Sequence, residues 1–512
     1  MADISVLQIG QADWTSQAAT DGLKWVHTTV ADLPTFLAQQ DEPFKLEQDY
    51  VLLTDLTLDS SLLVRKIEEW PAYRFIYLAE LSQISVELQQ ALSMRGAFHF
   101  NEQQPQTVAQ RILADLYLGQ IAFPTRFSEE QFIPTINYDW QFRRSGRFSS
   151  AFTGDFGDDW QQIGTLKTFA GDLNPNQDNL IYLDYDATGT AQVSLECVFF
   201  HGGRLQQLQF LRGDGLVNMT PLKAPARYQD YQIIVLAKGK GTVDLHAVHQ
   251  RRSRHGLGMF IPGGQRQLTE DNQEVLSYFN PGTKKGPMIV LFAGTRLHVE
   301  GFEMMGPLDK LGYPYLLFTD ARSQGGAFDV GNAAYEALVV KIIRKAQQFL
   351  GLTSDQVIMS GYSMGSYPAI YYTPDIKPGA LLLAKPILNL GTFTSSAEFP
   401  HSGVNHDWTL DVRRQLTGRV DPEDTVALNQ KLWHKLDQLS ATDWPQVSMF
   451  SMDSDEYDGV SLPQLLDYLK ERRVRLNHHG EPGYHEQKIP EMIRFMIDEY
   501  ERIIAEMIAK GR

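Results

Sequence analysis

The segment 357–369 constrains the fold of this chain most, because an apolar run leads directly into Gly-x-Ser-x-Gly and then into a predicted helix. Gly361 and Gly365 flank Ser363, and their lack of a Cβ atom permits the tight turn that holds such a serine in a strained conformation. The pattern is typical of a nucleophile elbow, which projects the serine hydroxyl above a sheet. The following helix begins with free backbone N–H groups, so the Met364 amide is a candidate oxyanion donor. Because Gly and Ser are common in loops, the alternative is a structural glycine turn without chemistry.

The length of 512 residues exceeds one ordinary core, and changes of composition divide the chain into three expected domains. Residues 1–128 alternate short apolar strands with amphipathic helices, which predicts a small α/β, Rossmann-like domain. Residues 129–270 are rich in aromatic residues, Gly, Asp and Asn, and turn residues separate strand-like pieces, which predicts an all-β sandwich. Its exposed aromatic or aspartate side chains are candidates for carbohydrate binding. The alternative is that Trp140, Trp160 and the tyrosines pack its core.

Residues 271–512 alternate strands and helices again, which predicts a doubly wound sheet of buried parallel strands. The elbow within this part predicts an α/β-hydrolase catalytic domain. The expected strands are 288–292, 315–318, 356–359, 380–383 and 447–452, and the expected helices are 333–350 and 491–509. The fold class is therefore α/β, with a C-terminal α/β-hydrolase fold preceded by a small α/β domain and an all-β sandwich domain.

Composition and charge exclude several classes of protein. The formal net charge of −16 argues against nonspecific binding to nucleic acid or to anionic lipid. The apolar runs fall short of the roughly 20 residues of a membrane-spanning helix, and the N-terminus lacks the pattern of a secretion signal. Cys197 is the only cysteine, which excludes an internal disulfide and is consistent with a reducing compartment. We therefore expect a cytoplasmic protein without a membrane span.

A serine nucleophile needs a base that accepts its proton and an acid that orients the base. In the order of an α/β-hydrolase, the base lies on a loop after the last core strand and before the last helix. His485 is the leading candidate, because it ends the expected loop 475–485 behind a Pro-Gly turn. His478 and His479, in the same loop, are the alternatives. Three other histidines lie in an insertion, where surface positions are expected: His401, His406 and His434.

The acid is expected just past the strand 447–452, where four carboxylates fall in six positions. They are Asp453, Asp455, Glu456 and Asp458. Four neighbouring anions cannot all be buried, so one or two should face the histidine while the others are solvated. Asp455 and Glu456 are the favoured candidates and Asp453 follows them, because sequence spacing does not separate neighbours.

A second oxyanion donor is expected on the loop that follows the strand 288–292. Small residues there let a backbone N–H approach a substrate, and the candidates are Gly294 and Thr295. The alternative is that Thr295 and the adjacent Arg296 are ordinary loop residues.

Three segments together resemble a known family: the elbow 361–365, the acidic cluster 453–458, and the run 482–485, which reads Pro-Gly-Tyr-His. They are similar to the second accessory Sec protein family of Gram-positive bacteria, and the three-part layout resembles that family over essentially the whole chain. The resemblance implies a cytoplasmic enzyme that O-acetylates N-acetylglucosamine on serine-rich repeat adhesins and supports their export through a dedicated translocase. Its implied partners are other accessory Sec proteins and the glycosylated adhesin, with peripheral association at the translocase.

The resemblance also implies site residues. The serine and histidine of the family map onto Ser363 and His485, and its acid is a glutamate, for which Asp455 and Glu456 both stay open. A serine acyl-enzyme can pass its acyl group to a sugar hydroxyl or to water, so a carbohydrate esterase is one alternative. Another is a noncatalytic export chaperone that uses the hydrolase fold as a scaffold. The residues indicate no bound cofactor or metal ion, and they leave the acetyl donor open.

Overall fold

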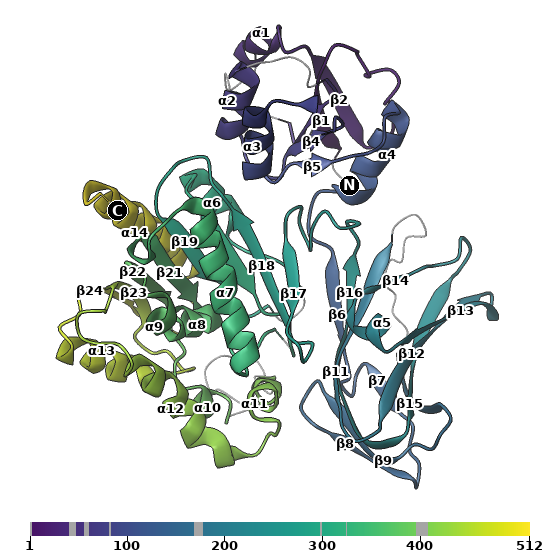
Figure 1. Ribbon diagram of the computed structural model, residues 1–512. Helices are drawn as coiled ribbons and strands as arrows, with labels where there is room; N and C mark the ends of the chain where they lie inside the picture. The colour runs from purple at the N-terminus through teal and green to yellow at the C-terminus, as the bar shows by residue number, and fades with distance from the viewer. Residues whose placement is uncertain are drawn as a thin grey trace.

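Three units of secondary structure make up the molecule, as the computed structural model in Figure 1 shows. The structure describes residues 3–39, 48–55, 61–80, 83–167, 178–296, 299–323, 325–395 and 408–511. A small N-terminal unit lies above two larger ones, a strand-rich unit from the middle of the chain and a C-terminal unit with a large sheet between helices. Within these ranges no helix has the length and apolar character needed to cross a bilayer.

The N-terminal unit is a small α/β layer, as the sequence predicts. Its strands are β1 (Ile4–Ile9), β2 (Leu23–Thr28), β3 (Tyr50–Leu53), β4 (Phe75–Tyr77) and β5 (Phe98–His99), and its helices are α1 (Leu33–Ala38), α2 (Ser61–Glu69), α3 (Val86–Met94) and α4 (Pro105–Asp115). The strands are parallel and lie in the order β2-β1-β3-β4-β5. Because successive side chains of a strand point to opposite faces, Leu7 packs with α2 and α3 while Val6 packs with α4. Helices therefore cover both faces.

The middle unit is a sandwich of two antiparallel sheets, which confirms the all-β prediction. Its strands are β6 (Ala122–Arg126), β7 (Phe132–Pro134), β8 (Trp140–Arg144), β9 (Ser150–Asp155), β10 (Gln161–Leu166), β11 (Asn179–Ala187), β12 (Gln192–His201), β13 (Arg204–Arg212), β14 (Thr220–Leu222), β15 (Asp230–Lys238) and β16 (Lys240–Arg252), with one short helix, α5 (Asp214–Val217). One sheet has the order β13-β12-β15-β10-β7 and the other β14-β11-β16-β9-β8, with β6 also paired to β16.

Aromatic residues pack the space between the two sheets of the sandwich. Trp140 is buried there beside Phe156, at 5.5 Å between ring centroids. Trp160 is half-buried instead, with Arg212 and Lys238 over its ring at 4.8 and 5.0 Å from the centroid. Neither tryptophan therefore presents an uncovered ring on the surface to which a ligand could bind.

Two strands lie across the boundaries expected at residues 128 and 270. β6 pairs with β16, so residues 122–126 join a sheet of the sandwich. β17 (Gln265–Leu268) pairs with β18 (Glu274–Asn280), so it joins the C-terminal sheet. One of these strands contains a proline and the other is polar, so composition does not reveal which unit they join. We propose domain boundaries just before β6 and just before β17.

The C-terminal unit is an eight-stranded sheet in the order β17-β18-β20-β19-β21-β22-β23-β24. Its further strands are β19 (Met288–Phe292), β20 (Tyr315–Thr319), β21 (Val357–Tyr362), β22 (Ala380–Ala384), β23 (Gln446–Met452) and β24 (Leu476–Glu481). Its helices are α6 (Met305–Leu311), α7 (Ala333–Leu350), α8 (Ser366–Tyr371), α9 (Thr373–Ile376), α10 (Leu390–Phe393), α11 (Thr409–Thr417), α12 (Thr425–Leu436), α13 (Ser461–Glu471) and α14 (Ile489–Ala509). β18 is antiparallel to both of its neighbours, and the strands from β20 to β24 are parallel. This order and these directions are those of an α/β-hydrolase fold, which confirms the predicted class.

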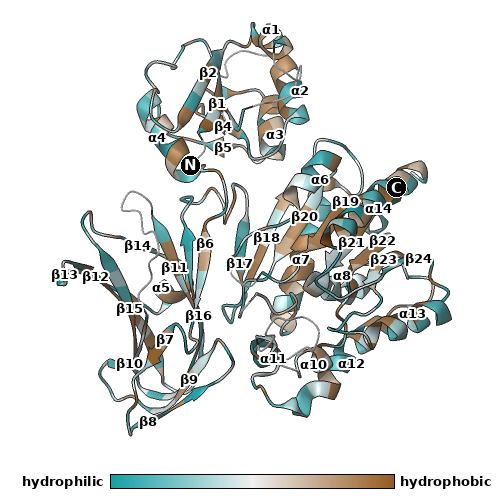
Figure 2. Ribbon diagram, turned by 180° about the vertical axis from the view of Figure 1, so that it is seen from behind, coloured by the Kyte–Doolittle hydropathy of each residue, from teal (hydrophilic) through white to brown (hydrophobic). Residues whose placement is uncertain are grey.

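Apolar residues fill both faces of this sheet, because helices cover each side. β19, β21 and β22 are almost entirely buried, as continuous apolar runs predict for central parallel strands. Val339 of α7 and Tyr367 of α8 pack on one face, and Leu308 of α6 and Met496 of α14 pack on the other. Figure 2 shows the hydrophobic strands β18, β19 and β20 in brown at the centre of this unit.

The segment 475–485 is not one long loop, because β24 occupies most of it. β24 is largely exposed and, among the described strands, pairs with β23 alone, at the edge of the sheet. Its Asn-His-His-Gly run lacks the apolar residues that mark a strand in sequence, since an edge strand needs to bury little. The expected loop therefore shrinks to the residues between β24 and α14.

A buried ionic network joins the sandwich to the C-terminal unit. Arg251 of β16 donates to Glu274 of β18 at 2.5 and 2.8 Å and to Glu300 at 2.6 Å. His249 lies 2.5 Å from the same Glu300. Removing one partner of a buried ion pair is costly, because the other charge is left without compensation. The network therefore fixes how β16 meets β18.

Candidate active site

The predicted elbow connects β21 to α8 through a single helical turn at Ser363–Gly365. Ser363 has φ of +51°, in the left-handed region that a residue with a side chain rarely adopts. A Cβ atom on Gly361 would lie 1.9 Å from the Gly365 carbonyl oxygen, and one on Gly365 would lie 2.1 Å from the Phe292 carbonyl oxygen. Both glycines are therefore required by close backbone contacts, and the turn holds the serine at the carboxyl end of β21.

Ser363, His485 and Asp455 form a hydrogen-bonded relay. Ser363 Oγ lies 2.9 Å from His485 Nε2, and His485 Nδ1 lies 2.8 Å from Asp455 Oδ2. The side chains of His485 and Asp455 are only 3% and 8% exposed, so the carboxylate and the ring meet with little water between them. When Nδ1–H donates to Asp455, Nε2 presents its lone pair to the serine hydroxyl, which can donate to it.

The four neighbouring carboxylates of the acidic cluster have different surroundings. Glu456 accepts the backbone N–H of His485 at 2.8 Å, so it holds the loop while Asp455 contacts the ring. Asp453 is exposed. Asp458 is buried, where its Oδ2 accepts the N–H groups of Leu388 and Asn389 at 2.5 and 2.7 Å. The expectation that the remaining acids are solvated is wrong for Asp458, because backbone donors replace water around it.

Burial raises the pKa of Asp458 to about 6, although hydrogen bonds from Ser461 and from the backbone oppose that rise. This carboxyl therefore titrates well above the usual range of an aspartate.

Tyr457 was not predicted to belong to the site, yet it covers the base. Its ring stacks on His485 with 4.2 Å between centroids and an angle of 17° between planes. Its backbone N–H donates to Asp455 Oδ1 at 3.0 Å, and its hydroxyl donates to Glu486 at 2.8 Å. Tyr457 thus restricts both the imidazole and the carboxylate. In the sequence, only its position between the favoured acids and Asp458 indicates that Tyr457 belongs to the site.

Lys385 also contributes to the site and was not predicted. It directly follows β22, has φ of +50° and is 1% exposed. Its ammonium group donates to the carbonyl oxygen of His485 at 2.6 Å and to that of Gln487. Burial lowers its pKa, and the nearby carboxylates oppose that effect. The available signal was a lysine at the carboxyl end of an apolar strand, beside the strand that carries Ser363.

His478 and His479, the alternative candidates for the base, have other partners. His478 contacts Ser451 Oγ at 2.8 Å and His479 contacts Glu481 at 3.0 Å, both along β24. Placing them in a catalytic loop is therefore wrong, because the strand fixes their side chains beside its neighbours. His434 is exposed on α12, as expected, whereas two other histidines of the insertion lie outside the described residues: His401 and His406.

The loop after β19 packs against the elbow. A Cβ atom on Gly294 would lie 2.6 Å from the Tyr362 ring, and Thr295 Oγ1 lies 3.6 Å from Met364 Sδ. The Tyr362 hydroxyl donates to Glu303, which pairs with Arg296 at 3.2 Å. Met364 N–H belongs to the first N–H groups of a helical turn, which have no acceptor within the helix. These contacts bring the expected oxyanion donors to the same end of the sheet as Ser363.

Groups of three or more His, Cys, Asp or Glu side chains arranged to hold a metal ion are absent from the part of the chain that the structure describes.

Comparison with known families decides where this chain belongs. A family model described as Accessory Sec system GspB-transporter matches residues 4–510. The chain belongs to this family. An accessory Sec system protein of Streptococcus gordonii is 26% identical over 513 residues, with 98% of each chain covered. One of Staphylococcus aureus is 29% identical over 371 residues, which are 71% of this chain and 70% of the relative.

The fold of this accessory Sec family member also matches a solved structure over its whole length. A chain of the Glycosylation Associate Protein (Gap123) complex from Streptococcus agalactiae superposes with a TM-score of 0.82, at 23% identity and with 98% of each chain covered. The resemblance drawn from the sequence implied a glutamate as the acid. In this accessory Sec protein it is Asp455 that meets the His485 ring, while Glu456 meets the backbone beside it.

Proposed function

We propose that this accessory Sec protein is a serine-dependent O-acetyltransferase that modifies N-acetylglucosamine on serine-rich repeat adhesins. The relay of Ser363, His485 and Asp455 carries the proposal, because hydrogen bonds of 2.9 and 2.8 Å join a nucleophile, a base and an acid. Such a relay activates a hydroxyl for acyl transfer. The acceptor sugar and the adhesin are inferred from family membership, since a triad by itself does not select them.

The proposed reaction has two halves. As Ser363 Oγ attacks the carbonyl carbon of the acetyl donor, His485 Nε2 takes the serine proton and then gives it to the departing group of the donor. The product is an acetyl ester on Ser363. A sugar hydroxyl then attacks this ester, its proton passes to His485, and the same proton returns to Ser363 as the acetylated sugar leaves. Asp455 stays ionised and stabilises the imidazolium that forms in each half.

The tetrahedral intermediates of both halves carry an oxyanion that needs hydrogen-bond donors. We assign Met364 N–H as one donor and an N–H of Gly294 or Thr295 as the second. Burial and Glu303 raise the pKa of the Tyr362 phenol well above its usual value, while a backbone hydrogen bond from Gly294 lowers it. Gly294 and Thr295 both stay candidates for the second donor, because each packs against the elbow.

We further propose that the protein supports export of the adhesin together with other accessory Sec proteins. Two observations support this role: the family is described as a transporter of the accessory Sec system, and a chain of similar fold occurs in the Gap123 complex. In this proposal the protein acts in the cytoplasm and meets the translocase peripherally. Partner binding would use outer surfaces, which a change at the partly buried Ser363 leaves intact.

The mass of the adhesin glycan tests the transferase role. Cells that carry wild type should yield acetylated glycan, whereas cells that carry Ser363→Ala should yield glycan without acetyl groups. Ser454→Ala, an exposed serine on the acidic loop, is the matched control and should behave as wild type. Pull-down of the other accessory Sec proteins with Ser363→Ala should succeed. An unchanged glycan in Ser363→Ala would favour the noncatalytic scaffold, and free acetate without glycan acetylation would favour the carbohydrate esterase.

A further inference from the structure

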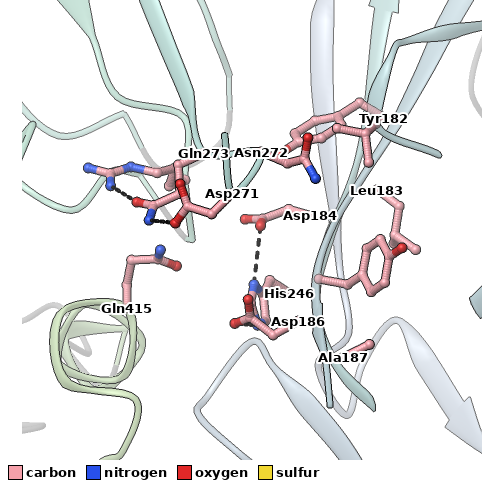
Figure 3. Close-up of a pocket in the computed structure, with 13 residues that line it drawn as sticks. Tyr182, Leu183, Asp184, Asp186, Ala187, His246, Asp271, Asn272, Gln273 and Gln415 are labelled. Atoms are coloured by element: carbon pink, nitrogen blue, oxygen red, sulfur yellow. Dashed lines mark hydrogen bonds and ion pairs between the residues drawn. The ribbon is translucent and has the colours of Figure 1, made fainter. Parts of the chain in front are cut away.

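A polar pocket of about 320 Å³ lies between the sandwich and the C-terminal unit, and its lining shares no residue with the Ser363 relay. One wall comes from β11 and β16 of the sandwich, and the other comes from the turn between β17 and β18, from Arg322 and from α11. Figure 3 shows the Asp184 carboxylate among the lining residues, with Gln415 on the opposite wall. The volume falls within the range of small-molecule sites.

Several polar groups of this pocket have hydrogen-bonding capacity that the protein does not use. Asp184 Oδ1 lies 3.2 Å from His246, but the buried Oδ2 meets no hydrogen-bond partner among the described residues. The Gln415 amide accepts from Ser323 at 3.3 Å, while its nitrogen donates to no residue that the structure describes. Asp184 Oδ2 has no accessible surface for a ligand to reach, whereas the Gln415 nitrogen is free to donate to a bound hydroxyl.

The charge of the lining selects against anionic ligands. Asp184, Asp186 and Asp271 contribute carboxylates to the pocket. The lining also holds two cations, and carboxylates engage both: Asp320 accepts from Arg322 at 2.9 and 2.6 Å, and Asp184 lies 3.2 Å from His246. Against the effect of its burial, neighbouring carboxylates raise the pKa of His246 to about 9. A phosphate or a carboxylate would therefore meet repulsion without a free guanidinium. The described residues also hold no cluster that suits a metal cation.

A neutral ring with many hydroxyl groups suits the remaining chemistry. The carboxylate oxygens of Asp186 and Asp271 accept from its hydroxyls, and the amide nitrogens of Gln415 and Asn272 donate to them. We propose that this pocket binds a neutral sugar unit, at a site separate from the Ser363 relay. That the sugar belongs to the glycan of the acceptor rests on the proposed function.

A backbone hydrogen bond connects the lining of the pocket to the elbow, because Gly326 N–H donates to the Arg322 carbonyl oxygen at 3.0 Å. Arg322, just after β20, lines the pocket, and Gly326 lies against Met364 beside the nucleophile. A Cβ atom on Gly326 would lie only 2.7 Å from Met364 Cε. A sugar held in the pocket therefore contacts the same segment that supports the proposed oxyanion donor.

Saturation-transfer NMR with N-acetylglucosamine tests the pocket directly. Wild type should bind this sugar, and N-acetylglucosamine 6-phosphate should bind more weakly because of the carboxylates. Gln415→Ala removes one donor and should weaken binding about three- to tenfold. Asp186→Trp places a large ring on the pocket-facing side of β11, at an exposed position where strands tolerate aromatic residues, and should abolish binding. Gln206→Ala, an exposed glutamine on β13 of the opposite sheet, is the matched control.

The outcome is independent of the chemistry at Ser363. Ser363→Ala should bind the sugar as wild type does, even if Ser363 proves not to be a nucleophile. Each variant is first checked for a wild-type melting temperature, and Gln415→Ala carries the test if Asp186→Trp does not fold. Absence of binding in wild type, wild-type affinity in Gln415→Ala and in a folded Asp186→Trp, or tighter binding of the 6-phosphate would each overturn the proposal.

Discussion

The Ser363 relay and the pocket beside β11 use buried polar groups in opposite ways. At the relay, Asp455 pairs with His485, His485 meets Ser363, and Lys385 is bound to two carbonyl oxygens of the base loop. In the pocket, the amide nitrogen of Gln415 donates to no residue in the described part of the chain.

This difference separates two tasks. Groups that satisfy one another are held in fixed positions, as reacting atoms must be. Groups without a partner are completed by a ligand, as a binding site requires. We therefore expect substitutions at the relay to affect chemistry and substitutions in the pocket to affect the affinity for sugar.

Loss of the base should separate the two regions most strongly. His485→Ala removes the proton acceptor of Ser363, so the rate of acetyl transfer should fall by roughly 10³-fold or more. Sugar binding measured by NMR should stay unchanged. His479→Ala, at an exposed position on β24, is the control and should keep near-normal activity. Activity lost in His479→Ala and kept in His485→Ala would show that His479, rather than His485, is the base.

The two adjacent carboxylates sharpen the account of the relay. Asp455→Asn should lower kcat by about 10³- to 10⁴-fold, because an amide no longer stabilises the imidazolium. Glu456→Gln should cost less than about tenfold, since its amide oxygen can still accept the His485 N–H. Steady-state kinetics on both variants measures the difference. If Glu456→Gln proves the more damaging of the pair, the acid is the glutamate that the family resemblance implied.

Lys385 is expected to act as a positioning residue. Lys385→Met keeps an unbranched chain but removes the donors to the His485 and Gln487 carbonyl oxygens, so the base loop should shift. A displacement of about 1 Å can cost about 100-fold, and we expect kcat to fall by roughly 10- to 100-fold with little change in KM. A purely structural role would instead lower the melting temperature and leave kcat per folded molecule unchanged.

Asp458 gives the smallest predicted effect. Its pKa of about 6 lies above that of an unfolded aspartate, so the folded state binds the proton more tightly. Its contribution to stability is therefore complete below about pH 4 and is lost as the pH rises through 6. The side chain in Asp458→Asn does not titrate. As the pH rises from 4 to 6, the melting temperature of this variant should therefore fall by a few degrees less than that of wild type. Parallel pH profiles for the two proteins would contradict this assignment.

Local patterns explain why much of the C-terminal unit could be predicted. A few neighbouring residues are enough to recognise some elements. Examples are the continuous apolar runs of β19, β21 and β22 and the glycines around Ser363. The order of elements in a hydrolase fold then pointed to His485. β24 escaped prediction because an exposed edge strand carries no apolar pattern.

Contacts between distant segments could not be predicted in this way. Asp455 and Glu456 are neighbours, and only the path of the backbone decides which one meets the His485 ring. Lys385 reaches its carbonyl acceptors across about a hundred residues of chain. The pocket draws its lining from the sandwich and from three segments of the C-terminal unit, so no single motif contains it.

Covalent labelling of Ser363 tests the central claim most directly. Wild type and Ser363→Ala are treated with a fluorophosphonate, and the mass of each intact protein and of its peptides is measured. Wild type should gain one adduct on the peptide that contains Ser363, and Ser363→Ala should gain none. Equal labelling of the two proteins, or an adduct on another serine of wild type, would contradict the assignment of Ser363 as the nucleophile.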